Sequence, residues 1–296
     1  MDQRAELSEF LRSRRARLKP EDVGLPDFGR HRRVPGLRRE ELAQLAGVSV
    51  AYYTRLEQGH GQNVSFEVLD SIARALRLSD TERDHLTHLA KPNQKKKKRS
   101  SRPTHALRPQ LQVLIDAMDA IPALYIGRRM EVLGWNRMAS ALFGDFATRP
   151  PEQRNMARMV FLEPETRDLH VDWECKAVEV VSSLRLCAGC HPDDRELSAL
   201  VGELSVKSED FRTLWAAHTV QEKGHGTKRL HHRLVGGMTL SYETLRVPDD
   251  HDLSLVTYHA EPGSASEESL GLLAKWGVDE KTYPVGDRRA RDADVT

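Results

Sequence analysis

The first ninety residues carry short apolar stripes at the spacing of α-helices, separated by polar stretches. Each stripe has a start or stop signal. In the capping box Ser79-Asp80-Thr81-Glu82, for example, the first and last side chains satisfy backbone N–H groups. We expect five helices and therefore an all-α N-terminal domain. They are residues 4–18, residues 39–45, a helix after Ser49, one from Ser65 through Leu76, and one after Ser79 that ends before Pro92.

The segment RREELAQLAGVSVAYYTRLEQG has the spacing of a helix-turn-helix. Ala43 is small where a second helix must cross closely, and Gly47 permits the left-handed conformation that the turn needs. Ser49 can accept a backbone N–H bond and so cap the next helix, which turns Tyr53 inward. The alternative interpretation is a plain three-helix bundle with a tight turn.

The opposite face of that second helix has the composition of a DNA-recognition surface. Such a helix places its outward residues against base edges in the major groove, while the preceding helix crosses the backbone. Arg55 can bond guanine through two hydrogen bonds, and Val50 or Ala51 can touch a thymine methyl group. Arginines before the turn, some of them in an Arg-rich loop, suit phosphates or the minor groove. The residues expected to contact DNA are Arg32, Arg33, Arg38, Arg39, Ser49, Val50, Ala51, Tyr52, Thr54, Arg55 and Gln58.

Behind Pro109 a helical stripe gives way to the period of strands. The segment PALYIGRRMEVLGW predicts two short strands around Gly127-Arg128-Arg129. A short helix follows, which Asn136 caps and Gly144 ends. This order of strand, tight turn, strand and Asn-capped helix is typical of the start of a PAS-type sensor domain.

The rest of this second domain predicts further strands and three amphipathic helices. LVGGMTLSY indicates a hairpin around Gly236-Gly237, and LSLVTYHAE indicates another strand of an antiparallel sheet. The helical stripes run from Trp173 to Cys187, from Leu197 to Leu204 and from Phe211 to His218. A sheet with several such helices can enclose an apolar cavity, although stripes of this kind also occur as plain core.

The charge is divided unevenly between the two halves. Residues 1–110 hold 23 Lys and Arg against 14 Asp and Glu, and the remaining residues hold 22 against 30. A basic N-terminal half favours a polyanionic partner such as nucleic acid, whereas the acidic remainder argues against DNA contact there. We expect a multidomain, mainly α protein. Its parts are a helix-turn-helix domain (1–91), a basic linker (92–106), an α+β PAS-like domain with an antiparallel sheet (107–277) and a disordered tail (278–296).

Other protein classes lack support in the sequence. The N-terminal segment MDQRAELSEFLRSRRARL is charged and has no apolar signal-peptide core. No later run approaches the ~18 apolar residues of a membrane span. We therefore expect a cytoplasmic protein without membrane contact. No Gly-rich phosphate loop, activated serine motif or supported carboxylate pair is evident, so we expect neither an enzyme nor a cofactor.

The run Cys187-Ala188-Gly189-Cys190-His191 matches the C-x-x-C-H signature of covalent c-type haem. The missing export signal counts against haem, because such haem is attached outside the reducing cytoplasm. We interpret the run as a helix–helix connection in which Gly189 stops one helix and Asp193 with Glu196 caps the next. The alternative function, from another class, is a redox- or metal-responsive sensor. Its candidate residues are Cys175, Cys187, Cys190 and His191, with a further cluster at His225, His231 and His232.

Five phrases occur in order along roughly residues 5–276. They are HRRVPGLRREELAQLAGVSVAYYTRLEQG, GWNRMASALFGDF, RNMARMVFLEPETRDLHVDWE, HPDDRELSALVGELSVKSEDFRTLWAAH and HGTKRLHH. Together they resemble the MmyB-like family of bacterial transcription regulators. The resemblance implies a Cro/repressor-type helix-turn-helix of the XRE class, joined to a PAS-like domain for which fatty-acyl ligands have been proposed.

We therefore expect a regulator that binds double-stranded DNA and a small apolar ligand. One recognition helix reads only a few base pairs, so a homodimer on an inverted-repeat operator is expected. Inward aromatic side chains should line the ligand cavity, with Arg154 or His218 at a polar or anionic head group. The expected ligand-binding residues are Trp135, Asn136, Arg154, Met159, Phe161, Trp173, Phe211, Trp215 and His218.

Overall fold

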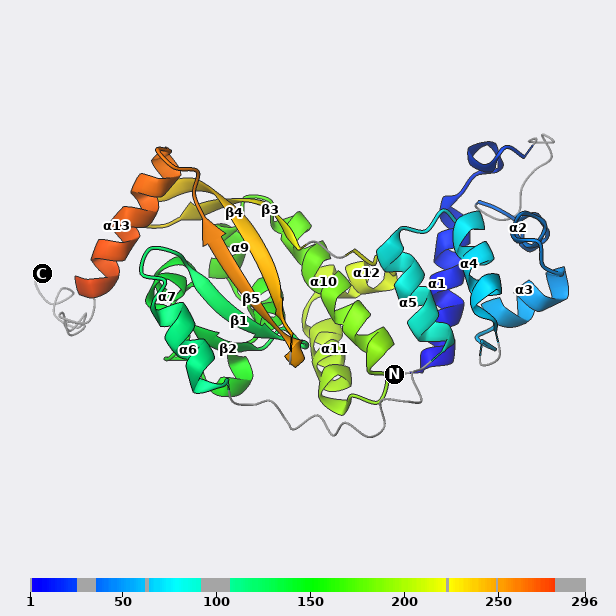
Figure 1. Cartoon of the computed structure of the whole chain (residues 1–296), viewed down its shortest axis with the longest axis horizontal. Helices are drawn as coiled ribbons and strands as arrows, with labels where there is room; N and C mark the ends of the chain where they lie inside the picture. The colour runs from blue at the N-terminus through cyan, green and yellow to red at the C-terminus, as the bar shows by residue number, and fades with distance from the viewer. Residues whose placement is uncertain are drawn as a thin grey trace, which may run out of the picture.

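The computed structural model of the 296-residue chain forms an elongated molecule, with a helical N-terminal part at one end and a sheet at the other (Figure 1). The predicted linker, most of the predicted tail, and Arg32 and Arg33 lie outside the described residues. The structure describes residues 2–25, 36–61, 64–91, 107–221, 224–248 and 250–279.

The N-terminal part contains the five predicted α-helices, packed around one apolar core that includes Phe10, Tyr53 and Leu86. Their starts follow the predicted signals, since Ser49, Ser65 and Ser79 each accept a backbone N–H bond at a helix start. The elements are α1 (Gln3–Arg17), the short 3₁₀ turn η1 (Pro20–Val23), α2 (Arg39–Ala46), α3 (Val50–Glu57), α4 (Phe66–Ala75) and α5 (Asp80–Ala90).

The turn between α2 and α3 has the geometry of a helix-turn-helix. Gly47 ends α2 with φ +67°, in the left-handed region that a side chain resists. Ala43, fully buried, allows α2 to approach its neighbours closely. Ser49 caps α3 by accepting a hydrogen bond from the backbone N–H of Tyr52 at 3.1 Å. The sequence-based prediction of this motif is confirmed.

The C-terminal part is built on a five-stranded antiparallel sheet of order β2-β1-β5-β4-β3. The predicted strands and the β3–β4 hairpin are present, but Arg233, Leu234 and Val235 make its turn. Gly236 and Gly237 are already the first paired residues of β4, which shifts the turn from its predicted position. The strands are β1 (Ala123–Gly127), β2 (Val132–Trp135), β3 (His225–His232), β4 (Gly236–Val247) and β5 (Asp250–His259).

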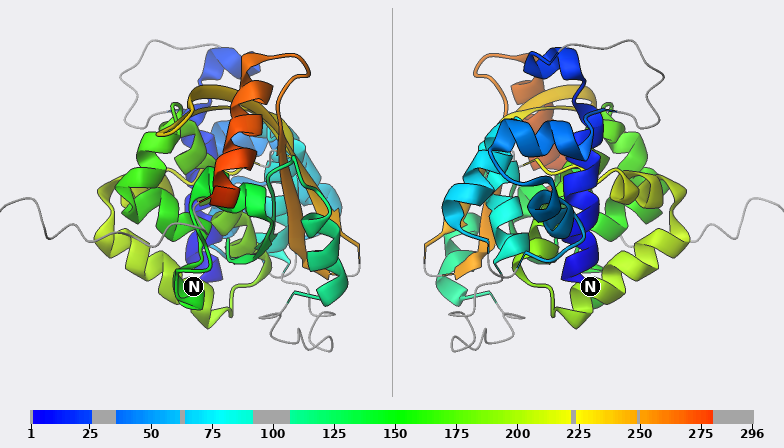
Figure 2. Two further views of the ribbon diagram at one scale, coloured as in Figure 1. Left: turned by 90° about the vertical axis from the view of Figure 1, so that its left-hand side faces the viewer. Right: turned by 90° about the vertical axis from the view of Figure 1, so that its right-hand side faces the viewer.

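Helices cover both faces of this sheet unequally (Figures 1 and 2). One face packs beneath α7 to α13 in a large apolar core, while α6 covers part of the other face around Ile115, Tyr125 and Leu253. No described helix is long and apolar enough to cross a membrane. The helices are α6 (Pro109–Asp116), α7 (Arg137–Phe143), η3 (Pro151–Gln153), α8 (Met156–Leu162), α9 (Pro164–Leu169), α10 (Trp173–Cys190), α11 (Arg195–Lys207), α12 (Glu209–Ala216) and α13 (Ala265–Asp279).

The C-x-x-C-H run is a helix–helix connection, but its details differ from the prediction. α10 continues through Gly189 and ends at Cys190. The cap of α11 is Asp194 rather than Asp193, since the Asp194 carboxylate accepts the backbone N–H of Leu197 at 3.0 Å. A Cβ at Gly189 would lie 2.7 Å from Cε1 of His85. The glycine therefore permits close approach of α5 instead of stopping its own helix.

The two parts of the chain are docked along α1 and α5 on one side and α10 and the segment after α12 on the other (Figure 1). Val220 is 3% exposed and belongs to the N-terminal apolar core. His85, against Gly189, is 1% exposed and meets the Phe10 ring edge-on at 5.1 Å. Apolar packing around Val220 and the close approach of His85 to Gly189 therefore form one part of the contact between the domains.

We predict that Gly189→Ala weakens this contact between the domains. The added methyl group would overlap the His85 ring, and overpacking of a tight contact costs about 1–3 kcal/mol. The free energy of unfolding, from denaturant titration, should fall by that amount. Gly202→Ala is the matched control, because Gly202 lies in α11 with nothing within 4 Å of the added Cβ, so it should be neutral or stabilising. Equal stability of both variants would contradict the tight contact.

Candidate DNA-binding and ligand-binding sites

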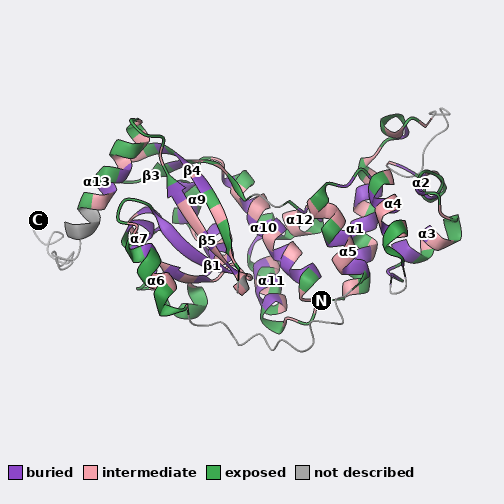
Figure 3. Cartoon of the chain, in the orientation of Figure 1, coloured by how far each residue is buried: buried purple, intermediate pink, exposed green. Residues whose placement is uncertain are grey.

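The outward face of α3 presents the residues expected to read DNA (Figure 3). Val50 is 41% exposed, and Ala51, Arg55 and Gln58 are exposed beside it, while Tyr53 and Leu56 are buried. Ser49 is exposed as well, and Tyr52 and Thr54 are half-buried. This face is continuous along the helix.

A buried ion cluster holds α3 in place behind that face. The Glu57 carboxylate accepts hydrogen bonds from Nε of Arg15 in α1 at 2.7 Å and from Nε of Arg39 in α2, and the Tyr53 hydroxyl donates to it at 3.2 Å. Burial would raise the pKa of Glu57, but the hydrogen bonds from Arg15 and Arg39 outweigh it, so the pKa is lowered. Glu57 therefore stays ionised and ties α3 to both neighbouring helices. Arg39 has this structural role in addition to its expected phosphate contact.

Arg38 is better placed than Arg39 for a simple phosphate contact. It is exposed at the start of α2, where its backbone N–H donates to the Glu41 carboxylate at 2.7 Å. No ion pair of the Arg38 side chain is found among the described residues. Sequence reasoning missed the Glu57 cluster; the available signal was an acidic residue next to the inward-facing Leu56.

Four of the expected ligand-binding residues form one chain of ring contacts in the C-terminal core. Phe161 meets Trp173 and Phe211 edge-on, with centroids 5.9 and 5.1 Å apart, and Phe211 stacks on Trp215 at 5.6 Å. Phe211 is fully buried, and the Trp173 indole N–H donates to the carbonyl of Val160 at 3.0 Å. These rings, named here the aromatic cluster, connect α8, α10 and α12.

The other expected ligand-binding residues lie outside that chain of rings. Met159 is buried in the same apolar core. Trp135 contacts Phe146 at 5.4 Å and the guanidinium of Arg154 at 5.2 Å, and Nε of Arg154 donates to two backbone carbonyls at 2.9 Å. The Asn136 side chain bonds five backbone groups of α6, β1, α7 and adjacent turns, which accounts for its whole amide.

His218 lies at the contact between the domains rather than in the aromatic cluster. Its Nδ1 is 2.9 Å from a guanidinium nitrogen of Arg185, and its Nε2 is 2.7 Å from the carboxylate of Glu9 in α1. Burial, followed by the positive charge of Arg185, lowers the pKa of His218 to about 4. The neutral ring then accepts from Arg185 and donates to Glu9.

Arg185 is a central residue of this contact, and sequence reasoning missed it. Its side chain is 1% exposed, pairs with Glu6 of α1 at 2.7 Å, and donates to the backbone carbonyl of Trp215. The guanidinium carbon also lies 4.2 Å from the centroid of the Trp215 ring. Arg14 of α1 completes the set by donating to the carbonyl of His218 at 2.6 Å. An arginine within the otherwise apolar stretch LRLCAG was the signal for it.

The geometry does not favour the redox or metal alternative. The three cysteines lie in the described part of the chain and none is in a disulfide. Burial raises the pKa of Cys187 to about 12, so its thiol stays protonated and unreactive. His231 and His232 point to opposite faces of β3. Within the described ranges, no group of three His, Cys, Asp or Glu side chains is arranged to hold a metal ion.

A shallow groove of about 460 Å³ lies on the N-terminal domain, between α2 and α4. Val23, Leu45, Gly47, Arg74 and Arg77 contribute to its lining. It contains none of the residues expected to bind the apolar ligand. The groove is therefore a separate surface feature of the helix-turn-helix domain.

Comparison with known families agrees with this architecture. A helix-turn-helix domain model matches residues 6–86, and the model of the MmyB-like transcription regulator ligand binding domain matches residues 107–273. No curated protein matches the chain. The molecule is thus a transcription regulator with a helix-turn-helix DNA-binding domain and a ligand-binding domain, which are regulatory rather than enzymatic modules. It belongs to the MmyB-like transcription regulator family.

We predict that His85 makes the stability of the docked molecule depend on pH. Neither ring nitrogen of His85 has a hydrogen-bond partner in the described part of the chain. Burial, followed by the charges of Arg185 and Arg14, lowers its pKa to about 3. A depressed histidine pKa contributes stability that is present above pH 6.5 and is lost as the pH falls toward 3, by about 1.4 kcal/mol per unit.

The free energy of unfolding of His85→Leu should therefore fall less steeply between pH 6.5 and 4 than that of the wild type. Urea titrations at several pH values measure this slope. His231→Gln is the control, because His231 is exposed on β3, and its slope should match the wild type. A slope unchanged in His85→Leu would show that the ring is protonated in the folded state.

Proposed function

We propose that the protein is a homodimeric, sequence-specific transcription regulator that reads an inverted-repeat operator and responds to a small apolar, fatty-acyl-like ligand. The observation that carries this proposal is the position of Arg185. One buried guanidinium contacts Trp215 of the aromatic cluster and Glu6 of the DNA-binding domain. A movement of Trp215 in the C-terminal domain can therefore be transmitted through Arg185 to Glu6 in the DNA-binding domain.

The DNA-binding half of the proposal rests on the exposed face of α3. Its exposed apolar residues, Val50 and Ala51, suit thymine methyl groups, and Arg55 suits a guanine edge. Arg38 at the start of α2 suits a phosphate, which positions the domain without reading sequence. Two copies of α3 about one helical turn (~34 Å) apart provide the specificity that a single helix lacks.

The ligand-responsive half rests on the aromatic cluster and its connection to α1. Phe161, Phe211 and Trp215 are in ring contact, so a hydrocarbon ligand that displaces Phe211 also displaces Trp215. Arg185 lies over the Trp215 ring and is bonded to its carbonyl, so this displacement changes the pairing of Arg185 with Glu6. α1 in turn packs against α3. The ligand acts only if it prefers one of two domain arrangements.

The DNA contact is tested with Arg55→Ala. If Arg55 reads a base, the variant should lose about 1–3 kcal/mol of binding free energy for the operator, and it should discriminate less between DNA sequences. Arg38→Ala should instead weaken binding to all DNA sequences alike, and it should reduce the salt dependence of binding. It is a cleaner control than Arg39→Ala, because Arg39 also pairs with buried Glu57.

Affinities for an operator, selected by the wild type from random-sequence DNA, and for unrelated DNA would be measured at two salt concentrations. Equal losses on both DNAs for Arg55→Ala and Arg38→Ala would exclude α3 as the reading element.

The coupling is tested with Arg185→Met, using dodecanoate as the probe. In the wild type, saturating dodecanoate should change operator affinity by about 5–150-fold, the usual range of coupling between sites. Without the guanidinium this factor should approach 1. Arg167→Met is the matched control, because Arg167 also lies over an aromatic ring, 3.8 Å from the centroid of Trp173, but pairs with Asp210 of its own domain. Equal ligand responses in the two variants would contradict the route through Arg185.

A further inference from the structure

One helix of the C-terminal part is apolar on both of its sides. α6 and the turn after it have the sequence PQLQVLIDAMDAI. On the inward side, Ile115 is fully buried and packs with Tyr125 against the sheet. On the outward side, Val113 is 68% exposed, Leu114 48% and Ile121 39% (Figure 3). A surface helix ordinarily places polar side chains outward, so these three residues, named here the α6 face, form an unusual exposed apolar surface.

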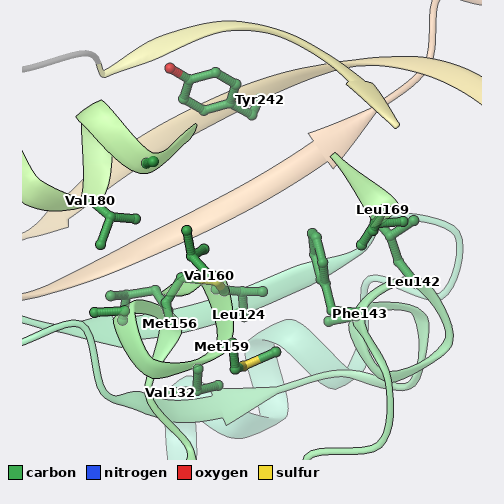
Figure 4. Packing of buried hydrophobic residues seen from close by; sticks show 14 of the residues in the cluster. Leu124, Val132, Leu142, Phe143, Met156, Met159, Val160, Leu169, Val180 and Tyr242 are labelled. Atoms are coloured by element: carbon green, nitrogen blue, oxygen red, sulfur yellow. The ribbon is translucent and has the colours of Figure 1, made fainter. Parts of the chain in front are cut away.

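The orientation of α6 is fixed by its inward contacts. The sheet separates two apolar cores, because successive side chains of a strand point to opposite faces. Leu124 of β1 packs in the large core with Val160 (Figure 4), whereas the next residue, Tyr125, packs against α6. The Asn136 amide also donates to three backbone carbonyls of α6 and its turn, among them that of Ile115 at 3.2 Å. A rotation of α6 that buried the α6 face would break these contacts and expose Ile115.

The two ends of α6 carry opposite charges that do not stabilise the helix itself. Arg108 is the exposed N-cap residue, Asp116 is the last helical residue, and Asp119 lies in the turn that follows. A helix dipole favours the reverse, with acidic residues at the start and basic residues at the end. Asp116 accepts a hydrogen bond from the Gln112 amide at 2.9 Å, but none of the three is in an ion pair within the described ranges. These charges are therefore available to a partner.

The longer parts of the chain outside the described residues are poor in apolar side chains. Residues 92–106, directly before α6, contain no Leu, Ile, Val, Met, Phe, Tyr or Trp. Residues 26–35 contain two such side chains, and eight of the seventeen residues 280–296 are Asp, Glu, Lys or Arg. Segments of this composition bury little apolar area. A second copy of the chain, in contrast, presents an apolar face of the same size and shape.

We propose that two copies of this chain associate through the α6 face, with their α6 helices packed antiparallel around Val113 and Leu114. A twofold axis perpendicular to the helices makes one apolar face complementary to itself. Antiparallel packing brings Arg108 of each copy toward the acidic end of the other helix, whereas parallel packing would bring like charges together. The inference rests on the proposed homodimer and assigns the surface that forms it.

The apolar contact is tested by sedimentation equilibrium of the full chain without DNA. The wild type should dimerise with a dissociation constant on the order of micromolar, since an interface of one helix is small. Val113→Glu should raise this constant by about 100-fold or more, because the twofold axis buries the unpaired charge twice. Val206→Glu is the matched control. Val206 is also a valine exposed on a helix, at 83% in α11, so its substitution should leave the constant unchanged.

The antiparallel arrangement is tested by reversing charges. Arg108→Glu should raise the dissociation constant by about tenfold, because twofold symmetry repeats the repulsion at both ends. The triple variant Arg108→Glu, Asp116→Lys, Asp119→Lys exchanges the charges of both ends and should return the constant to near the wild-type value. Restoration by two further substitutions cannot result from misfolding.

A wild-type dissociation constant in Val113→Glu, or equal weakening by Val206→Glu, would overturn the α6 face as the dimer interface while leaving the proposed homodimer intact. Failure of the triple variant to restore dimerisation would overturn the antiparallel arrangement. A wild type that is monomeric at about 100 μM without DNA, far above the expected constant, would also overturn the association. If that protein bound the operator as a single copy, the proposed homodimer itself would be wrong.

Discussion

The arrangement of the whole molecule depends on one buried cation. Arg185 lies in the C-terminal half of α10 at 1% exposure, and an isolated guanidinium at that depth would be strongly unfavourable. Its terminal nitrogens bond to Glu6 of the other domain, Nδ1 of His218 and the carbonyl of Trp215, while its Nε has no hydrogen-bond partner among the described residues. Separating the domains would remove the one carboxylate of this set. The docked arrangement is therefore the state in which the charge of Arg185 is compensated.

α1 connects this contact to the DNA-binding face. On one side it supplies Glu6 and Arg14 to the contact with the C-terminal domain. On its other side it supplies Arg15 to Glu57, the carboxylate that anchors α3. Buried ion pairs with directional hydrogen bonds specify geometry better than apolar contacts do, since each fixes a distance and an orientation. A small shift of α1 would thus change both the contact with the C-terminal domain and the anchoring of α3 through Glu57.

Much of the fold and part of the candidate site were predictable from local signals. Ser49, Ser79 and Asn136 cap helices because a side-chain oxygen near a free N–H group needs no distant partner. Gly189 shows where this reasoning stops. Its position near a helix end suggested a stop, but its actual role is to admit the His85 ring from a residue about a hundred positions away. Local reasoning was also incomplete for Asn136. It caps α7 as predicted, but its amide also bonds backbone groups of several other elements.

The sequence by itself determined the helix-turn-helix, the two strands on either side of the turn at Gly127, the apolar stripes and the family. Periodicity, caps and motif spacing suffice for these features because they act over a few residues. Tertiary structure alone decided which charges meet. It paired Arg185 with Glu6, and it placed the Glu57 carboxylate between Arg15 and Arg39. Electrostatic and hydrogen-bond partners are set by distance in space, and no local pattern in the chain encodes that distance.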